Sequence, residues 1–213
     1  MTSKLLPYKS YCEARQRAHK LVCDVKKHKK IHRIYNFDIK PIGSQKRRCI
    51  IQDSNGKYDL DYQIVLRNNC KGSLNPTDIK KAFLRAFTDC ANNNEKVEDS
   101  TTVVTVRCSK SNNKFDANLE KFSFDFVIID PTESKRIRRN GKDQYTWVEL
   151  PSKNKYIYDR FNNLDGNVQR HLLEEYVIPR VLEEKRKHES IREPTIDIFY
   201  EGVNNFYSKC LRK

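Results

Sequence analysis

Two short segments are patterned as β-strands that carry acidic residues, and they constrain the fold more than any other feature of the chain. In residues 58 to 66 apolar and polar side chains alternate, so Asp59 and Asp61 emerge from the same face of a strand. Residues 122 to 129 are almost entirely apolar, as in a strand inside a sheet, yet Asp125 lies among them. A carboxylate buried there without a partner costs several kcal/mol. We therefore expect a cationic group beside Asp125.

The rest of the chain predicts further helices and strands in a definite order. Apolar residues recur at helical spacing between Tyr8 and Val25, and a strand over residues 35 to 41 ends at Gly43. Asn75, followed by a proline, marks the start of another helix. The remaining expected elements are paired strands at 101–108 and 122–129, a strand at 144–150, a helix from about 165 that is kinked at Pro179, and a last helix at 194–211.

The composition describes a globular, basic protein. Charged residues make up 33% of the chain and hydrophobic ones 37%, and the formal net charge is +14. Basic runs at 26–30 and 185–187 fit helix C-termini, where cations are favoured. The runs Lys46 to Arg48 and Lys135 to Arg139 each follow a proposed active-site element, so we assign them to phosphate or nucleic acid. With no apolar run long enough to cross a bilayer and no signal peptide, we expect no membrane partner and a cytoplasmic location.

Cysteine and histidine usage argues against zinc. The seven cysteines are an odd number with no Cys-x-x-Cys pair, which favours reduced thiols and excludes a zinc ribbon. The five histidines form no His-Glu-x-x-His motif. Any metal bound by this chain should therefore be a hard cation held by oxygen ligands.

Taken in order, these motifs resemble the polymerase-β-like nucleotidyltransferases, and most closely the cyclic-oligonucleotide synthases of bacterial antiviral defence and their oligoadenylate-synthase relatives. The resemblance covers roughly residues 8 to 151 and fades beyond. It implies an α+β fold with a twisted mixed sheet flanked by helices over residues 1–151, and a short C-terminal helical lobe over residues 152–213. The matching features are Gly43-Ser44 followed by Lys46-Arg47-Arg48, a loop to Lys57, Asp59-Leu60-Asp61, the run Thr102 to Val106, and Trp147 and Pro151 after the third carboxylate.

The resemblance also implies the chemistry. Asp59, Asp61 and Asp125 are expected to be the catalytic carboxylates and to bind two divalent ions, Mg²⁺ or Mn²⁺. Gly43 would let the backbone approach an NTP triphosphate closely, with donors from Ser44 and charge-assisted contacts from Lys46 or Arg48. The expected partners are an NTP and, as acceptor or activator, nucleic acid.

Other readings remain open at this stage. The chain could be a non-enzymatic nucleic-acid-binding module or an antitoxin-like interaction protein that keeps the fold, although three acids in one place repel a phosphate backbone unless metal is present. Family members carry a larger helical lobe than residues 152 to 213 allow, and the lysine that this lobe presents to the triphosphate has no clear match here. The acceptor, the base preference and the form of the product are therefore left open.

Overall fold

The computed structural model describes residues 4–46, 50–53, 56–108, 122–150, 155–184 and 195–210. The chain divides into two compact units. The larger unit consists of Leu6–Ile50 and Gly56–Leu150, and the smaller one of Met1–Leu5, Ile51–Asn55 and Pro151–Lys213. The acidic strands both lie in the larger unit.

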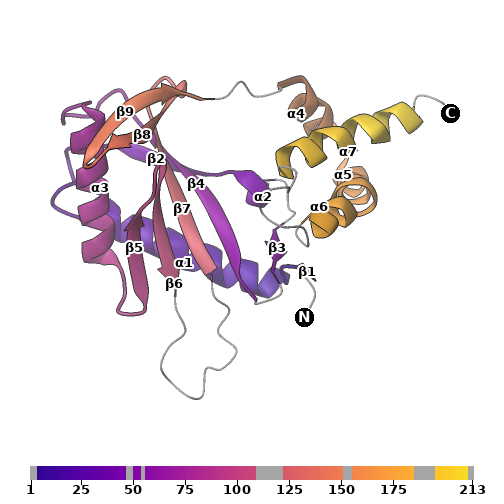
Figure 1. Ribbon diagram of the computed structural model, residues 1–213, viewed down its shortest axis with the longest axis horizontal. Coiled ribbons are helices and arrows are strands. Elements are labelled where there is room, and N and C mark those ends of the chain that lie inside the picture. The colour runs from indigo at the N-terminus through magenta and orange to yellow at the C-terminus, as the bar shows by residue number, and fades with distance from the viewer. Residues whose placement is uncertain are drawn as a thin grey trace, which may run out of the picture. The chain divides into compact units, whose positions relative to one another are not determined.

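Within the described residues, the larger unit contains a seven-stranded mixed sheet (Figure 1). The order is β2-β4-β7-β6-β5, and β8 pairs with both β7 and β9. Strands β4 and β7 run parallel, whereas the other pairs are antiparallel. The strands are β2 (Phe37–Pro41), β4 (Tyr58–Leu66), β5 (Glu95–Asp99), β6 (Val103–Cys108), β7 (Phe122–Ile129), β8 (Lys135–Gly141) and β9 (Gln144–Glu149).

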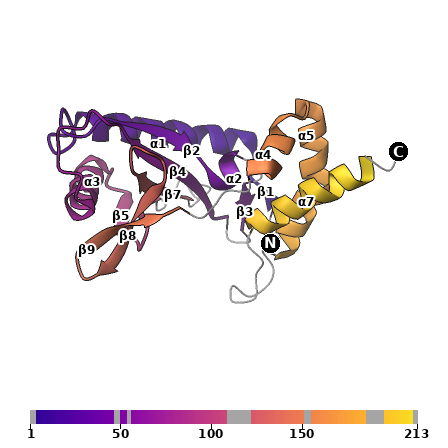
Figure 2. The same ribbon diagram turned by 90° about the horizontal axis from the view of Figure 1, so that it is seen from above.

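Helices α1 (Tyr8–Lys27) and α3 (Pro76–Cys90) pack their apolar faces into the main core of this unit (Figures 1 and 2). The strands contribute every second residue to that core, which is the pattern of a sheet with one covered face. Asn75 caps α3 by accepting a hydrogen bond from the Thr77 N–H, as its place before Pro76 predicted. The strand residues in this core include Leu60, Tyr62, Ile64, Val104, Val106, Phe124 and Phe126.

The smaller unit is mainly helical. A T-shaped pair of Phe161 and Phe199 joins its first and last helices, and the last helix passes so close to Val177 that a Cβ on Gly202 would lie 2.6 Å from it. A turn of π-helix replaces α-helix just before Pro179, because proline supplies no N–H to the preceding turn. The elements are β1 (Lys4–Leu5), β3 (Ile51–Gln52), α4 (Lys155–Asn162), α5 (Gly166–Leu172), a π-helical turn (Leu173–Val177), α6 (Ile178–Glu184) and α7 (Thr195–Cys210).

The structure confirms most of the expected elements and adds several. The strands at 58–66 and 122–129 have the predicted bounds, and the antiparallel pairing of β6 with β7 is confirmed. Strands β1, β3, β5 and β8 and helix α4 were not expected. Cys12, Cys23, Cys70, Cys90 and Cys108 are free thiols. Across the described residues, none of the helices combines the length and the apolar character that crossing a membrane requires.

Candidate active site

The register of the two parallel strands brings the predicted carboxylates to one face of the sheet. Asp61 on β4 lies directly opposite Asp125 on β7, and Asp59 lies opposite Ser123. Neighbouring strands are about 4.8 Å apart, and residues two positions apart on a strand share a face. Because Leu60 and Phe124 point into the main core, the three acids project from the opposite face. Two segments more than sixty residues apart thus form one acidic centre.

Hydroxyl groups from neighbouring strands hold two of these carboxylates. Ser123 donates to Asp59 Oδ1, and the Thr105 hydroxyl on β6 donates to Asp125 Oδ1 over 2.6 Å. Burial raises the pKa of Asp125 above its ordinary value, and repulsion from Asp59 adds to the shift, while the hydrogen bond from Thr105 opposes it. Asp125 is therefore a carboxylate whose negative charge is under-compensated, and a bound cation would relieve that cost.

Asp61 is the point at which the glycine-serine turn is fixed to the sheet. The four-residue helix α2 (Gly43–Lys46) follows β2, and both the Ile42 N–H and the side-chain amide of Gln45 donate to the backbone carbonyl of Asp61, over 3.0 and 2.8 Å. Gly43 has φ +60°, and a Cβ there would lie 2.3 Å from Asp61 Oδ2. Only glycine fits between this turn and the carboxylate.

A cation stands beside the acids on the same face. Arg107 on β6 is opposite Ser123 and binds Glu98 over 2.6 Å from Nε to Oε2. The hydrogen bond that Arg107 donates to Glu98 raises the pKa of Arg107, and the charges of Asp125 and Asp59 raise it further. Among the described residues, Asp125 therefore has a direct polar contact with the hydroxyl of Thr105, while the charge of Arg107 acts on it without an ion pair between them.

The donor set fits a hard divalent cation, although the side chains are not gathered around one point. Within the part of the chain that the structure describes, no three His, Cys, Asp or Glu side chains are close enough to form a metal cluster. Asp59 and Asp125 each direct one oxygen to a hydroxyl. Three carboxylates on one face of two adjacent strands supply the oxygen ligands that Mg²⁺ prefers.

The other predicted site residues are the serine and the basic residues after Gly43 and the basic run at 135–139. Ser44 is half-buried and Lys46 exposed, both on α2 next to Asp61, while Arg47 and Arg48 lie outside the described residues. The run Lys135 to Arg139 forms strand β8, in which Ile137 is buried. Two of its cations are ion-paired within the chain, Lys135 with Glu149 and Arg139 with Asp99, so less of its charge is available to nucleic acid than the run suggests.

Four neighbours of the acids were not predicted: Gln45, Thr105, Arg107 and Ser123. Three of them act on a carboxylate across a strand pair, and such contacts depend on a register that one strand's pattern does not reveal. Alternation within residues 103 to 108 does place Thr105 and Arg107 on one face. Gln45, two residues after Gly43, carried no recognisable pattern.

Comparisons with solved structures show that the chain shares the fold of CD-NTases. The chain is similar to the CD-NTase CdnG of Bradyrhizobium diazoefficiens solved with GTP, with 14% identity and a TM-score of 0.53 over 74% of this chain and 43% of that one. It is similar to CdnC of Escherichia coli MS115-1 solved with ATP, with 16% identity and a TM-score of 0.54 over 94% and 62%. It is also similar to Vibrio cholerae DncV in its 3′-deoxy ATP bound form, with 12% identity and a TM-score of 0.54 over 93% of this chain and 52% of that one.

These similarities show the fold of the chain. The chain spans about half the length of the structures that it matches. No protein-family model and no curated protein sequence matches it. The particular reaction must therefore be argued from the site.

Because burial disfavours the ionised form of Asp125, we expect this carboxylate to lower the stability of the fold when no metal is bound. Since its pKa is raised in the fold, the native state keeps a proton that the unfolded chain has lost, and stability falls as the pH rises from about 3.9 through the raised pKa. Asp125→Asn should therefore raise the melting temperature at pH 7. The gain should shrink as the pH approaches about 4.

Asp130, at the end of the same strand, provides a control for which the opposite change in stability is expected. Although burial opposes its ionisation, hydrogen bonds from Thr132 and from the N–H groups of Lys135 and Ser134 lower the pKa of Asp130. It is the turn acid that its place before Pro131 predicted, and Asp130→Asn should lower the melting temperature at pH 7. Thermal unfolding in a chelator at both pH values is the measurement. An Asp125→Asn protein less stable than wild type at pH 7 would contradict this account.

Proposed function

We propose that the chain is a divalent-metal-dependent nucleotidyltransferase that transfers an NMP group from an NTP to an acceptor hydroxyl. One observation carries the proposal: Asp61 and Asp125 are paired on the central parallel strands, with Asp59 on the same face and Gly43 packed against Asp61. A structural role does not explain this arrangement, because the acids repel one another and Asp125 is costly to keep ionised.

In the proposed reaction the acceptor oxygen attacks the α-phosphorus, the bond from that phosphorus to the β-phosphate oxygen breaks, and pyrophosphate leaves while the acceptor loses its proton. Asp59 and Asp61 would hold both divalent ions and Asp125 the ion on the acceptor side, and these ions would stabilise the charge on the attacking and leaving oxygens. The chain itself supplies the rigid strands that fix these three carboxylates, and the hydroxyl groups that orient two of them.

The turn at Gly43 suits the triphosphate of the donor. With no side chain at Gly43, the backbone comes close to Asp61, and so to any phosphate bound next to that carboxylate. Ser44 would donate its hydroxyl to a phosphate oxygen, and Lys46 and Arg48 would add charge-assisted contacts. Arg107, already beside Asp59 and Asp125, would offset the negative charge of the bound nucleotide.

The acceptor that we favour is a second nucleotide, which gives a cyclic or linear oligonucleotide. The fold supports this choice, since it is shared with CD-NTases, among them CdnG solved with GTP and CdnC solved with ATP. A nucleic acid acting as acceptor or activator would need cations outside the ion pairs of β8, such as Arg138, which is exposed.

The test is incubation with each α-³²P-labelled NTP, singly and in mixtures, with Mg²⁺ or Mn²⁺ and with or without added RNA or DNA. Chromatography of all products should show labelled material other than the NTP and its hydrolysis products. If every mixture stays unchanged while fluorescent RNA or DNA binds with a steep salt dependence, the chain is a nucleic-acid-binding protein that kept the fold. If neither occurs, it is an interaction protein.

Ser44→Ala should weaken NTP use less than loss of an aspartate does. The change removes one hydrogen bond to a charged group, worth about 1.5 to 3 kcal/mol, so kcat/KM should fall by roughly 10- to 100-fold. Steady-state kinetics is the measurement, with Ser208→Ala on α7 as a control expected to be neutral. A loss as large as that of Asp61→Asn would indicate that Ser44 is a nucleophile, which would overturn the mechanism.

A further inference from the structure

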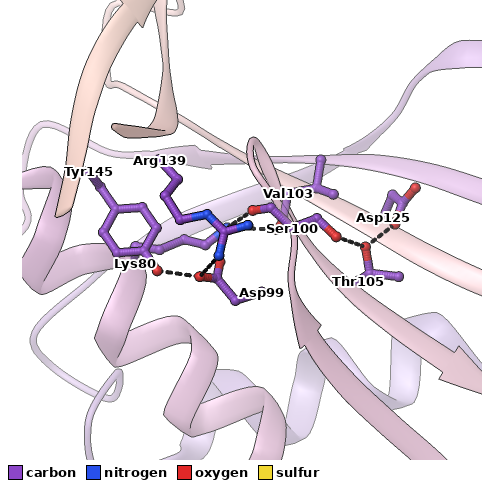
Figure 3. Close-up of polar contacts among 8 residues, drawn as sticks. All are labelled: Lys80, Asp99, Ser100, Val103, Thr105, Asp125, Arg139 and Tyr145. Atoms are coloured by element: carbon purple, nitrogen blue, oxygen red, sulfur yellow. Dashed lines mark hydrogen bonds and ion pairs between the residues drawn. The ribbon is translucent and has the colours of Figure 1, made fainter. Parts of the chain in front are cut away.

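A chain of hydrogen bonds runs from Asp125 away from the acidic face (Figure 3). Thr105 Oγ1 lies 2.6 Å from Asp125 Oδ1 and 2.9 Å from the hydroxyl oxygen of Ser100. An ionised carboxylate only accepts, so the single proton of Thr105 goes to Asp125, and Ser100 must donate to Thr105. The order Ser100 to Thr105 to Asp125 is therefore fixed by proton count.

Ser100 is held in place by a fully buried lysine on α3. The side chain of Lys80 is 1% exposed, and its Nζ lies 2.6 Å from the Val103 carbonyl, 3.5 Å from the Ser100 carbonyl and 3.3 Å from Asp99 Oδ1. Its ammonium group thus donates hydrogen bonds to two carbonyls of the turn that joins β5 to β6 and forms an ion pair with Asp99. Burial lowers the pKa of Lys80, and Asp99 opposes that shift. A lysine is rarely buried so completely unless it is paired in this way.

The β8–β9 hairpin holds the same turn from another side. Asp99 also accepts a hydrogen bond from the Tyr145 hydroxyl and pairs with Arg139 Nη1 at 3.4 Å. The Arg139 N–H donates to the Thr101 carbonyl over 2.7 Å. Three elements far apart in sequence therefore fix the position of Ser100, and the strand that carries Thr105 follows directly.

A structural role alone would be better served by valine at position 105. Thr105 is 4% exposed in the middle of β6, where a β-branched apolar residue packs well and a hydroxyl is costly unless it is bonded. Among the residues that the structure describes, its hydroxyl contacts only Ser100 and Asp125. Asp125 Oδ2 points away from Thr105 (Figure 3), so one oxygen is restrained and the other is free to be presented.

We propose that Thr105 is a positioning residue that fixes the Asp125 carboxylate for metal binding, that Ser100 orients Thr105, and that Lys80 anchors Ser100. The inference rests on the proposed function. A carboxylate held in one orientation binds an ion without first losing rotational freedom, so removal of the hydroxyl should raise the metal requirement more than it slows the reaction.

Thr105→Val keeps the shape of the side chain and removes the hydroxyl. Mn²⁺ binding in the presence of a non-hydrolysable NTP analogue, followed by electron paramagnetic resonance, should be about tenfold weaker than in wild type. The Mg²⁺ concentration for half-maximal turnover should rise by a similar factor, while kcat at saturating metal stays within roughly threefold. Thr105→Ser, which keeps the hydroxyl, should restore wild-type binding, and Ser100→Ala should weaken it by less than Thr105→Val.

Thr101→Val, an exposed change in the same turn, is the matched control and should leave Mn²⁺ binding unchanged. If Thr105→Val is folded and binds Mn²⁺ as wild type does, the inference is wrong while the proposed function stands. If Thr105→Val does not fold, Ser100→Ala takes its place: wild-type Mn²⁺ binding by that variant would show that the inference is wrong. If wild type itself binds no Mn²⁺ and forms no product, the proposed function fails first and the inference with it.

Discussion

Asp61→Asn and Asp125→Asn should each abolish nucleotidyl transfer while leaving the fold intact. Asparagine keeps the size and one acceptor oxygen of the side chain, so the hydrogen bond from Thr105 to position 125 can persist. What is lost is a negative charge that binds the divalent ions, and those ions supply several kcal/mol of transition-state stabilisation. We expect a fall in turnover on the order of 10³-fold or more.

The measurement is labelled product formed per enzyme under saturating NTP and metal, with circular dichroism to confirm the fold. Asp130→Asn is the matched control, because Asp130 ends the same strand but binds only its own turn. It should keep turnover within a few-fold of wild type. Wild-type product formation by either Asp61→Asn or Asp125→Asn would show that these carboxylates are not the metal site.

Gly43→Ala should have the next largest effect. A Cβ at this position would lie 2.3 Å from Asp61 Oδ2 and 3.1 Å from its Cγ, and the backbone has φ +60°, which L-residues disfavour by about 1 to 2 kcal/mol. Rotation of the Asp61 side chain relieves the contact but moves a carboxylate that we propose as a ligand of both ions. A displacement of about 1 Å at a reacting centre can cost roughly 10²-fold, and we expect such a loss in kcat/KM.

Gly141→Ala provides the comparison for that change. A Cβ at Gly141 would meet nothing closer than 3.8 Å, so this variant should be neutral in activity and nearly neutral in stability. Steady-state kinetics and thermal unfolding on both proteins separate a local effect at Asp61 from a general intolerance of alanine. A fully active Gly43→Ala protein would mean that Asp61 does not act from the position seen in the structure.

The elements that build the site were readable from the sequence because each has a local cause. Alternation over residues 58 to 66 gave β4, a continuous apolar run gave β7, and Asn75 before a proline gave the start of α3. That Asp59 and Asp61 share one face of β4 follows from strand periodicity alone. These features depend on a few neighbouring residues, so they can be predicted without knowledge of the partner strand.

What could not be predicted depends on pairing between distant strands. That Asp61 faces Asp125, and that Ser123 donates to Asp59, follows from a strand register between residues more than sixty positions apart. The bond from Thr105 to Asp125 depends on a second register, between β6 and β7. The basic run Lys135 to Arg139 was interpreted as a phosphate or nucleic-acid surface. It forms β8 because alternation buries Ile137, and Arg139 pairs with Asp99. Nothing near this run in the sequence identifies Asp99 as its partner.

The most direct test of the two-ion carboxylate site is a count of bound Mn²⁺. Wild type with a non-hydrolysable NTP analogue should bind two tight Mn²⁺ per chain in electron paramagnetic resonance titrations, as the shared carboxylates require. A variant with asparagine at 59, 61 and 125 should bind no more Mn²⁺ than the analogue does alone. Equal Mn²⁺ binding by that variant and by wild type would contradict the account.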